Sequence, residues 1–122
     1  DEAMRASAKP LRICDGVVAL PHTEAAVEAD GAKPRNWDLL LRTLAGWVCH
    51  PNVAAALVVG YGGEMLTPEV LRDHMKSAGY AFPKWFEFLT LGGHSFEEDL
   101  IAGREAVLPW LAEVDRCQRT EQ

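Results

Sequence analysis

Two histidines and two glutamates follow segments of the sequence that end in glycine or proline, and these four residues are His22, Glu24, Glu64 and His94. Carboxylates and imidazoles are the side chains that bind divalent metals and that exchange protons during catalysis. If the fold brought these residues together, they would suit a metal site or acid–base chemistry. The alternative explanation is chance, because every α/β protein carries some polar residues where its strands end.

Glycine pairs precede two of these side chains and offer backbone N–H groups to a ligand. Glycine has no Cβ, so it lets a ligand approach the main chain closely. We therefore expect the backbone at Gly62, Gly63, Gly92 and Gly93 to hold a substrate carboxylate, although the glycines are also explained as turn residues. Arg42 is a further candidate for binding that carboxylate, with a surface ion pair as the alternative. A nucleotide-phosphate site is weakly supported, because the G-x-G-x-x-G and Walker patterns are missing.

Three segments predict the strands that would position these residues. The run Ala55–Gly60 is wholly apolar, which is typical of a strand buried on both faces of a parallel sheet. Residues 11–20 predict an earlier strand, which Pro21 ends. Residues 85–91 are rich in aromatic side chains and predict a third strand.

Three helices are predicted between and after the strands, over residues 37–49, 68–78 and 96–114. A capping residue precedes each of them: Asn36, Thr67, and Ser95, which forms a capping box with Glu98. Pro109 lies inside the last helical pattern, where proline removes a backbone hydrogen bond, and predicts a kink or a break.

The order of these elements is β-α-β-α-β-α, which predicts an α/β fold. We expect a three-layer Rossmann-like or flavodoxin-like arrangement with a parallel sheet of at least three strands. All strands of a parallel sheet end at one edge, where ligands bind in such folds. The topology therefore predicts that His22, Glu64 and His94 meet at one rim. So small a sheet needs cover at its edges, which favours a partner subunit or the remainder of a larger polypeptide.

Composition limits the partners and the compartment. The chain has 122 residues, of which 12 are basic and 18 acidic, for a net charge of −6. Without a basic stripe or a membrane-spanning apolar run, nucleic acid and membranes are not expected as partners. Three cysteines without CxxC spacing favour reduced thiols in the cytoplasm. We expect a flexible leader over residues 1–10, a single domain over 11–115 and a loose tail over 116–122.

Four blocks of the sequence resemble one known family. They are GVVALPH at residues 16–22, LRTLAGW at 41–47, HPNV at 50–53 and LVVGYGGE at 57–64. In this order and at this spacing they resemble the altronate and galactarate dehydratases, which act on sugar acids. The resemblance covers roughly residues 11–64 and continues more loosely through the Gly92-Gly93 turn and the helix that follows.

The resemblance implies a lyase that removes water from a hydroxylated carboxylic acid, assisted by a divalent metal, usually Fe²⁺. His22 and Glu64 match the family's polar residues after the first two strands, which implies catalytic and metal-binding roles for them. His94 is the third catalytic candidate, from its place at the predicted rim. A small sugar acid is the implied substrate, and a homo-oligomer or a larger dehydratase is the implied assembly.

Two departures from the family pattern support a different hypothesis. Family members carry a cysteine after each of the first two strands, and Ala26 and Gly63 stand at these positions here. The alternative hypothesis is therefore a non-catalytic scaffold, or a binding or assembly module of this family, that has lost its metal-site cysteines. The absent cysteines favour that alternative, whereas the retained His22 and Glu64 favour an enzyme.

Overall fold

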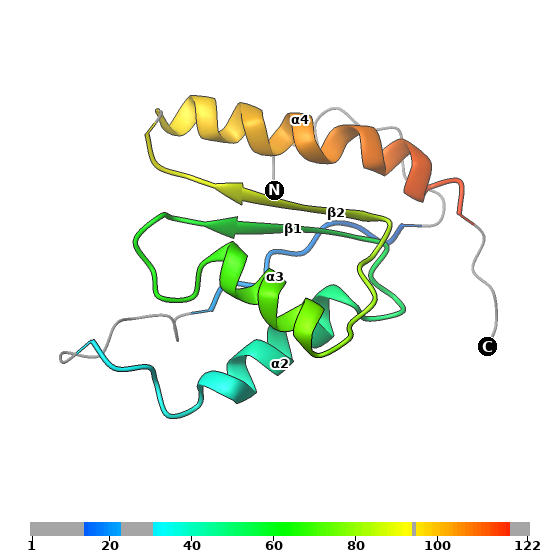
Figure 1. The fold of residues 1–122 in the computed structure, drawn as a ribbon. Coiled ribbons are helices and arrows are strands. Elements are labelled where there is room, and N and C mark those ends of the chain that lie inside the picture. The colour runs from blue at the N-terminus through cyan, green and yellow to red at the C-terminus, as the bar shows by residue number, and fades with distance from the viewer. Residues whose placement is uncertain (1–13, 23–30, 94, 118–122) are drawn as a thin grey trace.

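The computed structural model describes residues 14–22, 31–93 and 95–117. Along these residues the elements are α2 (Trp37–Val48), β1 (Ala55–Gly60), α3 (Pro68–Ser77), β2 (Trp85–Thr90) and α4 (Phe96–Val114). β1 and β2 pair in parallel, with Ala55 opposite Trp85 and Gly60 opposite Thr90. Helix α3 packs on one face of this sheet and α4 on the other (Figure 1). The predicted α/β class is confirmed.

The predicted first strand, residues 11–20, is not formed in its described part. Residues 14–20 have no regular structure, and Val17, Val18 and Leu20 are exposed. Apolar and β-branched side chains favour a strand only where they pack against a neighbouring strand or a core. The described part of this segment pairs with neither β1 nor β2 and leaves these side chains exposed, so the sheet there has two strands instead of the three or more predicted.

The remaining elements begin and end close to their predicted limits because capping and turn residues define them. The Thr67 hydroxyl accepts the backbone N–H of Val70 at the start of α3, and Pro68 occupies the first helical position. Gly79, with φ +76°, follows the C-terminal end of α3. Asn36 stands at the N-cap of α2 but makes no capping hydrogen bond through its side chain.

Pro109 does not break the last helix, so this part of the prediction was wrong. Helix α4 runs from Phe96 to Val114 through Pro109 without interruption, and Pro109 is exposed. The proline ring therefore points away from the packed side of the helix. Its cost is the hydrogen bond that its nitrogen cannot donate.

The hydrophobic core lies on only one side of the sheet. It consists of buried side chains from α2, α3 and the segment that joins β1 to α3, packed against the face of the sheet that carries Val58 and Phe86. The buried members are Trp37, Leu40, Leu41, Ala45, Val48, Leu66, Leu71 and Met75. On α4, by contrast, Val114 is the single buried residue.

No helix in residues 14–22, 31–93 and 95–117 has the length and apolarity that crossing a membrane requires. The predicted leader, residues 1–10, and most of the predicted tail lie outside the described residues.

Candidate functional site

The two glycine turns lie side by side at the carboxyl edge of the sheet. The backbone N–H of Leu91 donates to the Gly60 carbonyl at 2.7 Å, which extends the pairing of β1 and β2 past the strand ends. A Cβ built on Gly92 would lie 3.3 Å from the Tyr61 carbonyl oxygen, and one on Gly62 would lie 3.5 Å from Thr90 Cγ2. The structure thus brings together the segments that follow the second and third predicted strands.

Glycine is needed in these turns for its backbone conformation. Gly62, Gly92 and Gly93 have φ values of +78°, +103° and +124°. L-residues with side chains rarely adopt such values, so a substitution at any of the three would strain the backbone. Gly63 is different, because its φ is not positive and a Cβ built there would meet no heavy atom within 4 Å.

Glu64 folds back onto its own turn. Its Oε1 accepts the backbone N–H of Tyr61 at 2.8 Å, and its Oε2 accepts that of Gly63 at 2.9 Å. Burial of the carboxyl alone would raise the pKa of Glu64, but the N–H groups of Gly63, Glu64, Tyr61 and Gly62 outweigh it and hold that pKa below the ordinary 4.5. Glu64 is therefore an ionised side chain that fixes the shape of the turn.

Gly60 makes room for this arrangement. A Cβ built on Gly60 would collide with Glu64 Oε1 and would lie 2.7 Å from Cδ of Pro68, the first residue of α3. The last residue of β1, the Glu64 carboxylate and the start of α3 thus form one packed unit. This close approach explains why a glycine ends the apolar strand.

Helix α4 begins just beyond the second glycine turn, and its first turn is acidic. The Ser95 hydroxyl accepts the Glu98 backbone N–H at 3.3 Å, while Glu98 Oε2 accepts the Ser95 N–H at 2.8 Å, which confirms the predicted capping box. The backbone N–H and then the hydroxyl of Ser95 lower the pKa of the Glu98 carboxyl. With Glu97 and Asp99 beside it, this helix end carries negative charge that complements the helix dipole.

The other predicted site residues are not joined to Glu64. His22 is exposed in an irregular segment, and within the described ranges no hydrogen bond or ion pair links it to Glu64. Arg42 is exposed on α2, where its Nε donates to the Asp38 carbonyl at 3.3 Å. His94 and Glu24 lie outside the described residues. The rim therefore consists, where it is described, of Glu64 and the glycine backbone.

The backbone donors at the rim divide into two kinds. The N–H of Gly63 is taken by the Glu64 carboxylate, so it does not serve a substrate in this conformation. The N–H groups of Gly92 and Gly93 donate to no other described residue, and both glycines are exposed. These two are the donors that a carboxylate ligand could use.

The described residues do not by themselves form a metal centre. Among them, no group of three or more His, Cys, Asp or Glu side chains is placed to hold a metal ion. Both oxygens of Glu64 already accept backbone N–H groups, which weakens this carboxylate as a ligand. A metal at this rim would need ligands from outside the described ranges.

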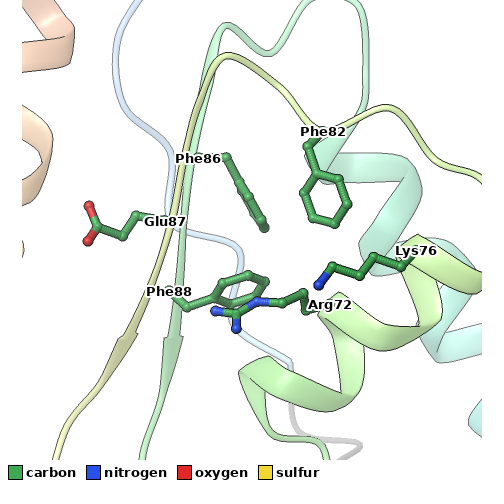
Figure 2. Close-up of a pocket in the computed structure, with 6 residues that line it drawn as sticks. All are labelled: Arg72, Lys76, Phe82, Phe86, Glu87 and Phe88. Atoms are coloured by element: carbon green, nitrogen blue, oxygen red, sulfur yellow. The ribbon is translucent and has the colours of Figure 1, made fainter.

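A groove that the sequence did not predict lies on the core side of the sheet, away from the rim. Its lining residues come from α3, from β2 and from the segment between them: Arg72, Lys76, Phe82, Phe86, Glu87 and Phe88 (Figure 2). The signal was present, because Phe86 and Phe88 alternate along the strand while Arg72 and Lys76 stand four residues apart on the helix. The groove could not be found without knowing that these two faces meet.

The fold and the rim define a class of protein, namely a small α/β domain with paired glycine turns and a fixed carboxylate where its parallel strands end. Over residues 2–115 the chain matches the family described as D-galactarate dehydratase/altronate hydrolase, second domain. The chain therefore belongs to this family, as the sequence blocks predicted. No curated protein and no solved structure gave a significant match.

Proposed function

We propose that this domain takes part in removing water from a sugar acid, a hydroxylated carboxylic acid, at the rim that carries Glu64. The observation that carries the proposal is the family match over residues 2–115, which suggests a galactarate dehydratase/altronate hydrolase-type domain. The paired glycine turns support it, because exposed N–H groups at Gly92 and Gly93 suit a carboxylate.

Dehydration of such an acid removes a proton from the carbon next to the carboxylate and expels hydroxide from the neighbouring carbon. A general base works best when its pKa lies near the working pH, so the low pKa of Glu64 makes this carboxylate a poor base. We assign to Glu64 the positioning of the turn and to His22 and His94 the transfer of protons, since imidazole is the side chain that most often acts as a general acid or base in enzymes. The backbone of Gly92 and Gly93 would hold the substrate carboxylate.

The family resemblance also implies a divalent metal, Fe²⁺ first, with His22 and Glu64 as its ligands. Bound beside the substrate, such an ion would stabilise the negative charge that develops as the proton leaves. Because the described residues do not form a metal centre alone, the roles above are assigned to side chains and backbone only. Elemental analysis of protein purified without chelators measures whether a divalent metal is retained.

The proposal is tested by incubating the protein, with and without added Fe²⁺, with a panel of aldonic and aldaric acids and measuring the 2-keto product. We expect product from at least one acid, and at least a tenfold lower rate for Glu64→Gln, because a loosened turn misplaces the groups around it (about 1.4 kcal/mol). Glu69→Gln is the matched control, since Glu69 is exposed in the first turn of α3. Equal rates for wild type and Glu64→Gln would contradict the role of Glu64.

A second candidate function is a non-catalytic scaffold or an assembly module of the same family. It is favoured by one observation: Glu64 is fully used in holding its own turn, with Gly63 where the family carries a cysteine. Because a Cβ at Gly63 meets nothing within 4 Å, Gly63→Cys places a thiol there without strain. If the lost thiol is what removed the metal, this variant should retain more iron than Gly63→Ser.

The assembly is also a proposal. The described sheet has only two strands, and a larger dehydratase or a homo-oligomer would supply the cover that its edges need. The substrate, a small sugar acid, would then bind where this rim meets the rest of the enzyme.

A further inference from the structure

The groove beside β2 combines aromatic walls with two positive charges. It has a volume of about 460 Å³ and is open to solvent. The rings of Phe82 and Phe86 are 5.4 Å apart between centroids, and those of Phe86 and Phe88 are 4.6 Å apart, edge to face. Figure 2 shows these rings and the side chains of Arg72 and Lys76 on the side of the sheet that faces α3, with the Glu87 side chain on the opposite side.

The positive charges of the groove have no acidic partner among the described residues. The guanidinium of Arg72 lies 4.3 Å from the centroid of the Phe88 ring, and Lys76 is exposed one helical turn further along α3. The ion pair found in the described part of the chain joins Lys84 to Glu113 and involves neither Arg72 nor Lys76. In a chain of net charge −6, such a groove fits an occupant that is both apolar and acidic.

The outer face of α4 has this chemistry. Phe96, Leu100 and Ile101 are 77%, 57% and 55% exposed, and they recur at a spacing that places them on one side of the helix. Three exposed acidic side chains, Glu97, Glu98 and Glu105, lie among them together with one exposed basic side chain, Arg104, so this part of the helix carries net negative charge. An apolar helix face with carboxylates along it complements an aromatic groove with an arginine and a lysine.

The two surfaces belong to different copies of the chain. Helix α4 packs on one face of the sheet, and the groove opens on the other face (Figures 1 and 2). A helix held on one side of a sheet does not reach the groove on the other side. The complementary surfaces are therefore placed to meet between molecules.

We propose that the N-terminal half of α4 of one copy docks in the groove between α3 and β2 of a second copy. The contact is heterologous, so repetition of it gives a closed ring or an open chain of copies. The proposal does not depend on the dehydratase activity, because the groove and the rim are separate.

The test is sedimentation velocity of the isolated chain from low to high micromolar concentration, at low and at high salt. We expect wild type to associate, and to associate less as salt screens the charges. Lys76→Glu in the groove and Glu97→Lys on α4 should each weaken association about tenfold or more. Mixing these two variants should restore it, because each acidic surface then meets a basic one.

Controls separate a lost contact from a lost fold. Arg35→Glu makes the same change of charge at an exposed arginine before α2 and should associate like wild type. Circular dichroism should show that Glu97→Lys keeps its helix, and Leu100→Ser should weaken association without a change of charge. A monomeric wild type, charge variants that associate like wild type, or a mixture that stays apart would each overturn the proposal. If another domain of the enzyme covers the groove instead, the isolated wild-type chain should stay monomeric.

Discussion

Glu64 stands at the edge of the sheet where the sequence predicted it, and its carboxylate is engaged within its own turn. Its position after a glycine turn predicted a base or a metal ligand, and it does stand at the edge where β1 ends. Its carboxylate, however, accepts N–H groups from Tyr61 and Gly63 of the same turn. The direction of the Glu64 side chain depends on the backbone conformation of its turn. The spacing of residues in the sequence does not give that conformation.

The depressed pKa of Glu64 makes stability depend on pH in the acid range. A carboxyl whose pKa is lower in the folded than in the unfolded state stabilises the fold above its ordinary pKa of 4.5, and this stabilisation is lost as the pH falls through the folded-state value. Urea unfolding between about pH 3 and pH 6 should therefore show wild type losing stability faster than Glu64→Gln. Parallel curves would show that the carboxylate makes no net contribution, and Glu69→Gln, at an exposed position, should follow wild type.

Substitution at Gly60, the last residue of β1, should be costly, and substitution at Gly63, three residues later, should be tolerated. Alanine at Gly60 collides with the Glu64 carboxylate and the Pro68 ring, so we expect Gly60→Ala to lower the free energy of unfolding by about 2 kcal/mol. Alanine at Gly63 meets nothing and should leave stability unchanged or slightly higher. Chemical denaturation of both variants measures the contrast, and equal effects would contradict the packed unit at the end of β1.

At the scale of elements, the ends of helices and strands were predictable wherever a capping residue, a proline or an apolar run determines them. The limits of β1, α3 and α4 followed from an apolar run, from Thr67-Pro68 and from the Ser95–Glu98 box, and the structure has them within a residue or two. The apolar content of residues 11–20 and the stop at Pro21 predict a strand that the described part of this segment does not form. A strand is a pairing between segments, so its formation depends on a neighbour that the local sequence does not reveal.

Pro109 is an unfavourable residue inside a helix that nonetheless continues through it. The helix continues through it, but its nitrogen donates no hydrogen bond to the turn before. We expect Pro109→Ala to raise the free energy of unfolding by about 1–2 kcal/mol, since proline is the poorest residue inside a helix and this one is exposed. Thermal and urea unfolding measure the change. Arg104→Ala, also exposed on α4, should stay within about 0.5 kcal/mol, and a destabilised Pro109→Ala would contradict the assigned cost.

At the scale of the whole molecule, the two faces of the sheet are unequally packed. The side toward α2 and α3 carries the core around Met75, which is fully buried. On the side toward α4, Val59 of β1 is 44% exposed. The C-terminal half of α4 is tied down by Val114 and by a hydrogen bond of 3.2 Å from Trp85 Nε1 to Glu113 Oε2. In the N-terminal half no residue is fully buried, although Gly103 lies against Leu89 of β2, and the capping box fixes the start of the helix.

Because the two faces are unequally packed, we expect the free energy of local opening to differ between the helices. Segments with few buried apolar contacts open locally at a lower free-energy cost than the core. Hydrogen–deuterium exchange should therefore be fastest, among the helices, in the N-terminal half of α4, slower toward Val114 and slowest in α2 and α3. Uniform protection of the three helices would contradict the prediction.

The same measurement at rising protein concentration connects this stability to the proposed contact between copies. If the outer face of α4 docks in the groove of another molecule, exchange around Leu100 should slow as concentration rises, because binding stabilises the docked helix by mass action. Exchange at β2 and α3 around Phe88 should slow in parallel, and exchange in α2 should not. In Lys76→Glu, which leaves α4 unchanged, protection at Leu100 should no longer depend on concentration. Protection that rises in this variant as in wild type would show that another surface joins the copies.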